Sequence, residues 1–220
     1  MNDPSAGFSQ RCVIIGAAPG TNTDLLCRMI LPDDYVICAD GGFTAAMEAG
    51  IPVHLLIGDF DSCPQPEPSV CETMVLPVNK DDTDTLFCVR EAIRRGYTDF
   101  LLLGMTGGRP DHTFANYSVL LYLANRGLHG CIRDEQAQYE VLLNQEARLL
   151  QKAGFGFGIF PFGCPECNVS LHGFLYEADR LTLRAEFPMG VSNTVLLDDA
   201  RIVVHSGSAL WMLYGFQDCS

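Results

Sequence analysis

Two aspartates, Asp59 and Asp61, stand one residue apart directly after the apolar segment 53–57 and Gly58. In an extended chain, residues two apart point the same way, so their carboxylates are expected side by side. Carboxylates that close repel each other unless a cation lies between them. Mg²⁺ prefers such hard oxygen ligands together with substrate phosphates. The pair therefore indicates a magnesium site, although a solvated acidic turn after a strand is the alternative for this segment alone.

Further polar motifs follow other predicted strands in the first half of the chain. The Asp-Gly-Gly triplet 40–42 comes directly after the apolar segment 35–39, and residues 104–112 come directly after the apolar segment 99–103. In an open parallel sheet the carboxyl ends of the strands share one edge, where ligands bind. We therefore predict that five acids distant in sequence converge at this edge: Asp40, Asp59, Asp61, Asp84 and Asp111.

Glycines and a few cations in the same motifs could bind phosphate. Glycine turns leave backbone N–H groups accessible to a ligand, and four such residues are Gly41, Gly42, Gly107 and Gly108. Lys80 and Arg109 are rare cations among acids and could grip phosphate, or could pair with the neighbouring aspartates. His112 and Asn116 are one helical turn apart on a predicted helix. His112 could equally cap that helix.

The order of predicted elements sets the fold class. Strands and helices alternate up to about residue 143, which predicts a mostly parallel sheet covered by helices. From about residue 145 the apolar segments are short and β-like, and glycine or proline turns separate them. We predict an α/β protein, with an N-terminal, mostly parallel, Rossmann-like catalytic domain at residues 1–143. A small all-β sandwich domain is expected at residues 144–220.

The composition excludes several classes of partner. The chain carries a net charge of −13, so it offers no basic face for nucleic acid or an anionic membrane. No apolar stretch approaches the ~20 residues of a membrane span. Residues 1–11 are polar and lack the apolar core of a secretory signal. These features predict a cytoplasmic protein.

The ten cysteines mostly lie inside apolar segments, as Cys12, Cys38 and Cys88 do. Buried free thiols in a reducing compartment are the expected result. Cys164 and Cys167 form one Cys-x-x-Cys motif, which is half of a typical zinc set. His172 and another thiol could complete that set, but a plain β-turn is the simpler interpretation.

Four motifs, in their order and spacing, resemble thiamine pyrophosphokinase of the bacterial type. They are Asp40-Gly-Gly, Gly58-Asp-Phe-Asp-Ser62, Asp81-Asp-Thr-Asp84, and Gly108-Arg-Pro-Asp-His112 with Asn116. The resemblance covers residues 12 to about 214 and is closer in the first half. It implies Mg²⁺-dependent transfer of a diphosphate from ATP to the hydroxyethyl group of thiamine, which gives thiamine diphosphate and AMP. It also implies an α/β domain, a β-sandwich, and a homodimer with thiamine sites at the subunit interface.

The same resemblance assigns roles to residues of the first domain. Mg²⁺ on the triphosphate would be held by Asp59, Asp61 and Asp84. Phosphates or nucleotide would be positioned by Asp40, Lys80, Asp81, Arg109 and Asp111. The catalytic set is then expected to be the three metal ligands with Arg109 and Asp111.

In the second domain the resemblance implies that Tyr176 stacks on a thiamine ring, while Ser192 and Asn193 hydrogen-bond the pyrimidine. The sequence departs from the family pattern beside Tyr176. Leu175 stands where the family has lysine, and Glu177-Ala178 stands where many bacterial members have Pro-Leu. An ordinary aromatic residue of a β-sheet is the alternative for Tyr176.

Two other functions fit parts of the pattern. A nucleotide phosphatase could use the Asp59 and Asp61 pair, with one aspartate as nucleophile, but the remaining motifs would then have no role. A nucleotide or thiamine sensor could use the same scaffold without catalysis, although a binder needs no such combination of acids and cations. AMP release measured with and without thiamine separates all three functions.

Overall fold

The computed structural model of the chain describes residues 10–19, 21–59, 70–77 and 82–215. The protein has a mixed α/β fold and divides into two compact units, Met1–Val119 and Leu120–Ser220. Helix α4 runs across the division between the units. The domain boundary expected at residue 143 stays a prediction.

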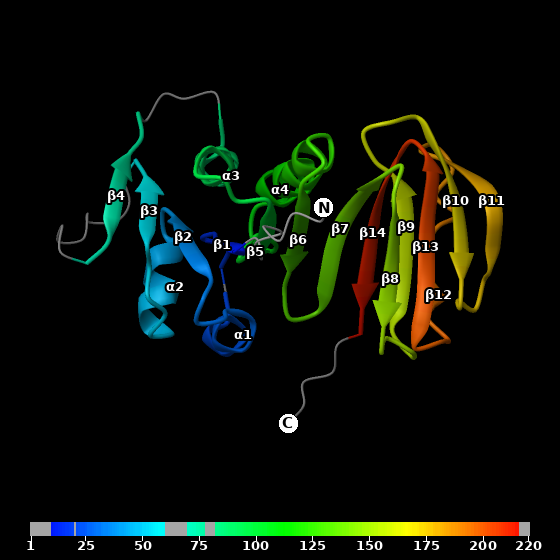
Figure 1. Cartoon of the computed structure of the whole chain (residues 1–220), viewed down its shortest axis with the longest axis horizontal. Coiled ribbons are helices and arrows are strands. Elements are labelled where there is room, and N and C mark those ends of the chain that lie inside the picture. Colours follow the sequence, from blue (N-terminus) through cyan, green and yellow to red (C-terminus); the bar gives the residue numbers. More distant parts are fainter. Residues whose placement is uncertain (1–9, 20, 60–69, 78–81, 216–220) are drawn as a thin grey trace, which may run out of the picture. The chain divides into compact units, whose positions relative to one another are not determined.

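Five parallel strands form the centre of the first unit, in the order β5-β1-β2-β3-β4 (Figure 1). In the four strands other than β4, almost all side chains are apolar and buried. Such burial is expected for a parallel sheet that is covered on both faces. The strands are β1 (Cys12–Ile15), β2 (Tyr35–Ala39), β3 (Leu55–Gly58), β4 (Glu72–Val75) and β5 (Asp99–Leu103).

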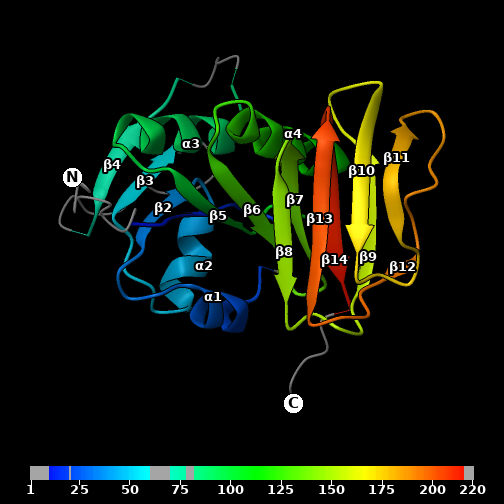
Figure 2. The ribbon, with the colours of Figure 1, turned by 45° about the vertical axis from the view of Figure 1, so that its right-hand side comes forward.

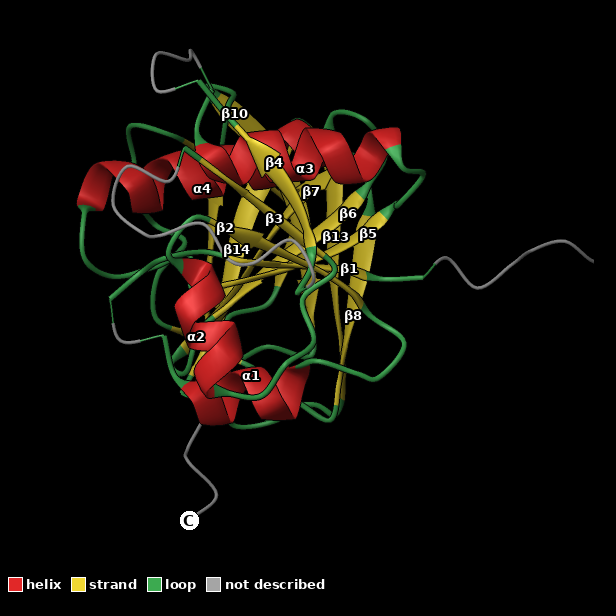
Figure 3. Cartoon of the chain, turned by 90° about the vertical axis from the view of Figure 1, so that its left-hand side faces the viewer, coloured by secondary structure: helices red, strands yellow, loops and turns green. Residues whose placement is uncertain are grey.

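Helices cover both faces of these strands. In Figure 3, α1 and α2 lie on one side of the sheet, and α3 lies on the other. The sequence fixes two of the helix starts, because the side chains of Asn22 and Thr83 accept hydrogen bonds from backbone N–H groups of the first turn. The helices are α1 (Thr23–Met29), α2 (Gly42–Glu48), α3 (Asp84–Arg94) and α4 (Pro110–Ala124).

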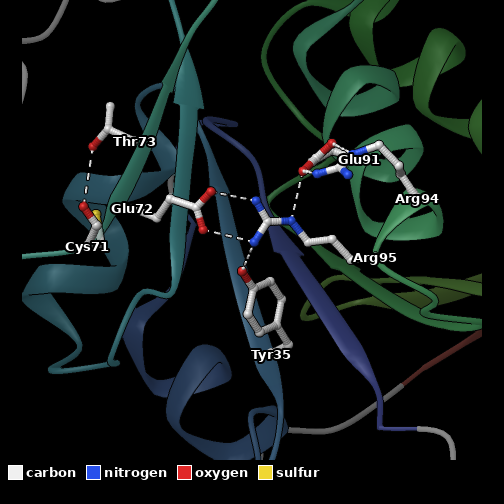
Figure 4. Close-up of polar contacts among 7 residues, drawn as sticks. All are labelled: Tyr35, Cys71, Glu72, Thr73, Glu91, Arg94 and Arg95. Atoms are coloured by element: carbon white, nitrogen blue, oxygen red, sulfur yellow. Dashed lines mark hydrogen bonds and ion pairs between the residues drawn. The ribbon is translucent and has the colours of Figure 1, made fainter.

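An ion-pair network joins α3 to the amino ends of two strands (Figure 4). Arg95, directly after α3, donates to Glu72 at the start of β4 (2.6 and 2.9 Å) and to the hydroxyl of Tyr35 at the start of β2 (2.8 Å). It also donates to Glu91 (2.8 Å), which accepts two further bonds from Arg94. The network lies at the edge opposite the polar motifs, so its role is structural.

The second unit consists of antiparallel strands in two layers (Figure 2). One layer has the order β12-β9-β14-β7-β6 and the other β11-β10-β13-β8. Two of these strands, β8 and β12, were not expected from the sequence. The strands are β6 (His129–Arg133), β7 (Ala137–Leu143), β8 (Glu146–Leu150), β9 (Gly156–Pro161), β10 (Glu166–His172), β11 (Ala178–Arg184), β12 (Asn193–Thr194), β13 (Asp199–Ser206) and β14 (Ser208–Tyr214).

One apolar core lies between these two layers. Phe157 of β9 packs on Phe174 at a ring separation of 4.6 Å and on Trp211 of β14 at 6.3 Å. Val169 and Ile202 of the facing layer belong to the same buried cluster. Buried apolar side chains of both layers therefore pack against one another to form this core.

The buried free thiols expected in the apolar segments are present in the described residues. Cys12, Cys38 and Cys88 are buried and unpaired. Cys164 contacts the carbonyl of Ser208 (3.2 Å), and Cys167 lies in the sandwich core. In the ranges that the structure describes, no three His, Cys, Asp or Glu side chains are grouped as metal ligands. No helix among the described residues is long and apolar enough to span a bilayer.

Candidate active site

A cavity of about 560 Å³ lies where the carboxyl ends of β1, β2 and β5 meet the start of α3, all within the first unit. Of the five acids predicted to converge at this edge, Asp40 and Asp84 line the cavity, and Asp59 and Asp111 do not. Polar motifs from separate loops thus contribute some of the residues that line it. The predicted site residues among them are Asp40, Asp84, Gly107, Gly108, Arg109, His112 and Asn116.

Asp40 is held tightly against the end of β3. Its backbone N–H donates to the carbonyl of Ile57 (2.8 Å), and its φ of +43° lies in the left-handed region, which aspartate tolerates better than most residues. A Cβ on Gly58 would come within 3.2 Å of Asp40 Oδ1. The glycine therefore makes room for the Asp40 side chain beside the strand that leads directly to Asp59.

The loops after β1 and β5 interlock to form another wall of the cavity. A Cβ on Gly16 would lie 2.6 Å from the carbonyl oxygen of Gly104, and Ala18 N–H donates to that same oxygen (3.1 Å). Residues 16–19 line the cavity although the sequence analysis did not include them in the site. The sequence could have indicated these residues, because this loop, like the predicted motifs, directly follows a strand of the parallel sheet.

Two predicted phosphate-binding glycines, Gly41 and Gly42, do not line the cavity. Gly42 is buried at the start of α2, where an added Cβ would lie 2.2 Å from the carbonyl oxygen of Ile15. Close packing of α2 on β1 is thus sufficient reason for a glycine at this position. A contact of these two residues with nucleotide stays a prediction.

The amino terminus of α3 faces the cavity. Thr83 caps the helix by accepting from Leu86 N–H (3.2 Å), and Asp84 begins its first turn. Asp82, Thr83 and Thr85 line the cavity beside Asp84, and Asp82 is paired with Arg90 of the same helix. Free N–H groups and the helix dipole make such a terminus favourable for a phosphate.

Arg109 and Asp111 form a two-bond ion pair beside the cavity. Arg109 donates from Nε to Oδ1 (3.1 Å) and from Nη2 to Oδ2 (2.5 Å), while the two side chains are 71% and 64% exposed. The Arg109 hydrogen bonds lower the pKa of Asp111 to about 2. Arg109 lines the cavity and Asp111 does not. The guanidinium is therefore held near the site by a carboxylate that stays ionised.

His112 and Asn116 lie in α4 and both line the cavity, as their helical spacing predicted. Asn116 is buried, and its side-chain N–H donates to the carbonyl of Met105 (2.8 Å). Met105 follows β5 and accepts a long hydrogen bond from Thr85 at its sulfur (3.7 Å). Asn116 thus links α4 to the loop after β5, in addition to lining the cavity.

Three predicted site residues, Asp61, Lys80 and Asp81, lie outside the described residues. Of the predicted metal ligands, Asp84 lines the cavity, and Asp59 is partly buried directly after β3. Carboxylates are the hard oxygen donors that Mg²⁺ prefers. The chemistry of the described donors therefore fits Mg²⁺.

A second cavity, of about 400 Å³, lies within the second unit. Its walls are mostly apolar, and two predicted thiamine residues, Tyr176 and Asn193, line it. Tyr176 is 63% exposed, whereas Asn193 is buried. Ser192 is not among the lining residues, and its φ of +59° is left-handed. Glu177, a departure from the family pattern, also lines this cavity.

Comparison with known proteins agrees with the geometry. Residues 27–132 match the family described as thiamin pyrophosphokinase, catalytic domain. Residues 27–132 therefore form a segment similar to the catalytic domain of the thiamine pyrophosphokinase family. The match includes Asp40, Asp84 and the 107–112 loop, so the cavity in the first unit lies in the catalytic domain of this family. No curated protein matches the sequence significantly.

Solved thiamine pyrophosphokinases share the fold. The Bacillus subtilis protein is 19% identical, with a TM-score of 0.82 over 93% of this chain and 99% of its own. The Geobacillus thermodenitrificans protein is 23% identical, with a TM-score of 0.82 over 96% and 100%. The yeast protein is 13% identical, with a TM-score of 0.79 over 95% and 87%. These likenesses cover both units, beyond the part matched by the family.

Proposed function

We propose that this protein transfers the diphosphate of ATP to the hydroxyl of thiamine, forming thiamine diphosphate and AMP. The observation that carries the proposal is the cavity of the first unit, in which Asp40, Asp84 and Arg109 meet the amino terminus of α3. Phosphoryl-type transfer requires positioning and charge neutralisation more than covalent chemistry. The thiamine hydroxyl oxygen would bond to the β-phosphorus as the bond to the AMP oxygen breaks.

Each part of this site has a proposed task in binding ATP. The N–H groups at the start of α3 and around Gly107 and Gly108 would hold phosphate oxygens, because helix amino termini and glycine turns offer backbone donors to anions. Arg109 adds a planar, permanently charged donor suited to two phosphate oxygens. Lys80, Asp81 and Asp111 complete the nucleotide site as predicted from the family motifs.

The proposed metal is Mg²⁺, with Asp59, Asp61 and Asp84 as ligands. It would supply positive charge against the polyphosphate, which a protein of net charge −13 needs. Asp59 and Asp84 approach the site from different elements, the end of β3 and the start of α3. The two proposed ligands would therefore reach the metal from different elements of the first unit.

Thiamine recognition is proposed for the cavity of the second unit. Tyr176 presents an exposed ring next to apolar walls, which suits a flat heteroaromatic ligand. Ser192 and Asn193 belong to the same proposed subsite. Leu175, Phe187 and Val191, all more than half exposed, add apolar surface in this unit.

We propose a cytoplasmic homodimer in which a second copy covers these exposed apolar side chains. Contiguous exposed apolar residues commonly mark an interface. The buried, unpaired thiols of Cys12, Cys38 and Cys88 agree with a reducing compartment. Light scattering on the purified protein measures the assembly directly.

The proposal is tested by incubating the protein with ATP, Mg²⁺ and thiamine and measuring thiamine diphosphate and AMP. We expect equal amounts of both products, and no AMP when thiamine is omitted. Asp84→Asn should reduce the rate at least ~100-fold, because a ligand of the proposed metal is lost. The control Asp33→Asn removes an exposed carboxylate before β2 and should leave the rate unchanged. AMP or phosphate release independent of thiamine would contradict the proposal.

A further inference from the structure

The turn that carries Tyr176 is fixed by a neighbouring segment of the chain. Leu175 N–H donates to the carbonyl of Thr194 (2.8 Å), and Leu196 N–H donates to the carbonyl of Gly173 (2.8 Å). Phe174 and Val195 form an isolated β-bridge between these bonds. The backbone of residues 173–176 therefore takes its position from residues 193–196.

Asn193 forms the last link of this connection. Its Oδ1 accepts hydrogen bonds from the N–H groups of Tyr176 (2.9 Å) and Thr194 (2.8 Å), and its Nδ2 donates to the carbonyl of Tyr176 (2.9 Å). The side-chain amide thus bonds both backbone polar groups of Tyr176. Both acceptor sites of Oδ1 are used, and one hydrogen of Nδ2 is not. Asn193 is only 7% exposed.

The segment before Asn193 is equally constrained. Ile159 N–H donates to the carbonyl of Gly190 (2.8 Å), and a Cβ on Gly190 would lie 1.7 Å from the carbonyl oxygen of Ile159. Only glycine permits this approach to β9. Ser192 then takes a left-handed φ of +59°, which turns the chain before Asn193. The Gly-Val-Ser-Asn motif is accordingly built to place the Asn193 amide.

We propose that Asn193 is a positioning residue, which fixes the backbone of Tyr176 so that its exposed ring is presented to thiamine. The inference rests on the proposed function and refines the role first assigned to Asn193, a hydrogen bond to the pyrimidine. The side chain of Tyr176 has freedom to move, because it is 63% exposed. Fixing its backbone reduces the entropy lost when the ring is ordered against a ligand.

A double-mutant cycle tests this assignment. Asn193→Ala, Tyr176→Ala and the double variant are assayed for kcat/KM toward thiamine at saturating ATP. Two hydrogen bonds to Tyr176 are lost in Asn193→Ala, so we expect kcat/KM to fall about tenfold, with the KM for ATP unchanged. If Asn193 acts through Tyr176, the double variant should match Tyr176→Ala within about twofold.

The matched control is Asn168→Ala. Asn168 also donates from its side-chain amide to a backbone carbonyl, that of Arg180 (2.7 Å), and to the hydroxyl of Thr182 (3.2 Å) in the same unit. Its hydrogen bonds among the described residues do not reach the turn that carries Tyr176, so the KM for thiamine should not change. If Asn168→Ala lowered kcat/KM toward thiamine as much as Asn193→Ala does, the effect would be a general one on stability, and the proposal would be overturned.

The proposal would be overturned if the two substitutions lowered kcat/KM independently, so that their fold-changes multiplied in the double variant. If Asn193→Ala lowers kcat/KM as much in the Tyr176→Ala background as in the wild type, Asn193 contacts thiamine directly through its remaining hydrogen. If Asn193→Ala does not fold, Asn193→Asp replaces it in the cycle, because its carboxylate keeps the acceptor for both N–H groups. Absence of thiamine-dependent AMP release in the wild type would contradict the proposed function itself, a result distinct from either outcome of the cycle.

Discussion

Glu91→Gln should destabilise the first unit, because it removes the negative charge between two guanidinium groups. Glu91 is only 7% exposed and accepts bonds from Arg94 (2.7 and 2.7 Å) and Arg95 (2.8 Å) (Figure 4). Arg95 keeps Glu72 and Tyr35 as partners in the variant. The expected loss of stability is therefore that caused by removing one charge from the network, because Arg95 remains paired.

The magnitude follows from the pKa of Glu91. The guanidinium of Arg94, and then that of Arg95, lowers this pKa from 4.5 to about 2. At about 1.4 kcal/mol per pKa unit, this shift of about 2.5 units corresponds to about 3.5 kcal/mol. Solvent screens the exposed Arg94, so we expect about 2 kcal/mol in the free energy of unfolding. For a protein of this size that is a decrease of roughly 4–8 °C in Tm.

The pH dependence has a definite sign. The folded-state pKa is lower than the unfolded one, so the stabilisation by Glu91 is complete above the unfolded pKa of 4.5 and is lost as pH falls toward about 2. The difference in Tm between wild type and Glu91→Gln should therefore be constant from pH 7 to about pH 5. It should decrease at lower pH, where circular dichroism melts can follow both proteins.

Asp199→Asn is the control for this prediction. It removes the charge of a different carboxylate–arginine pair, that of Asp199 with Arg148, in which the side chains are 53% and 60% exposed. Exposed pairs contribute little, so its Tm should not change measurably. Equal Tm values for Glu91→Gln and wild type at pH 7 would refute the argument from burial. A difference that stays constant from pH 7 to pH 3 would refute the argument from the pKa.

Two further predictions concern the first unit, one on its packing and one on its cavity. Gly42→Ala should lower the free energy of unfolding, measured by urea titration, by ~2 kcal/mol or more, because the added Cβ would lie 2.2 Å from the carbonyl oxygen of Ile15. The control Gly41→Ala should lower it far less, because the nearest atom to its added Cβ would lie 3.2 Å away. Arg109→Ala should raise the KM for ATP about tenfold or more and leave the KM for thiamine nearly unchanged. In that variant the pKa of Asp111 should rise from about 2 toward 3.8, which an NMR titration of the carboxyl group would show.

The convergence of the site was predictable because it depends on a rule of topology. In a parallel sheet, whatever follows a strand lies at one edge. Asp40 and Gly107 could therefore be placed together from sequence although 66 residues separate them, and both line the cavity. The loop 16–19 obeys the same rule. It was missed because it contains no charged residue that could indicate chemistry.

The antiparallel unit was less predictable for a physical reason. Pairing of β8 with β13 joins residues about 50 apart in sequence, and β12 has only two residues. Neither depends on a local pattern that a short window could detect. Short apolar segments separated by glycine or proline turns were sufficient to predict β-structure here, but they could not determine which strands pair.

For single glycine and asparagine residues too, the local sequence does not determine which distant residues they contact. A motif predicts which residue types are needed, but the reason for a residue depends on what approaches it in space. Gly42 and Gly190 both lie against a backbone carbonyl of a strand, and the Asn193 amide bonds the backbone of a residue 17 positions earlier. Asn116 likewise bonds the carbonyl of Met105. Several residues of the family motifs thus hold the scaffold, and fewer residues than the motifs contain are left to contact ATP or thiamine directly.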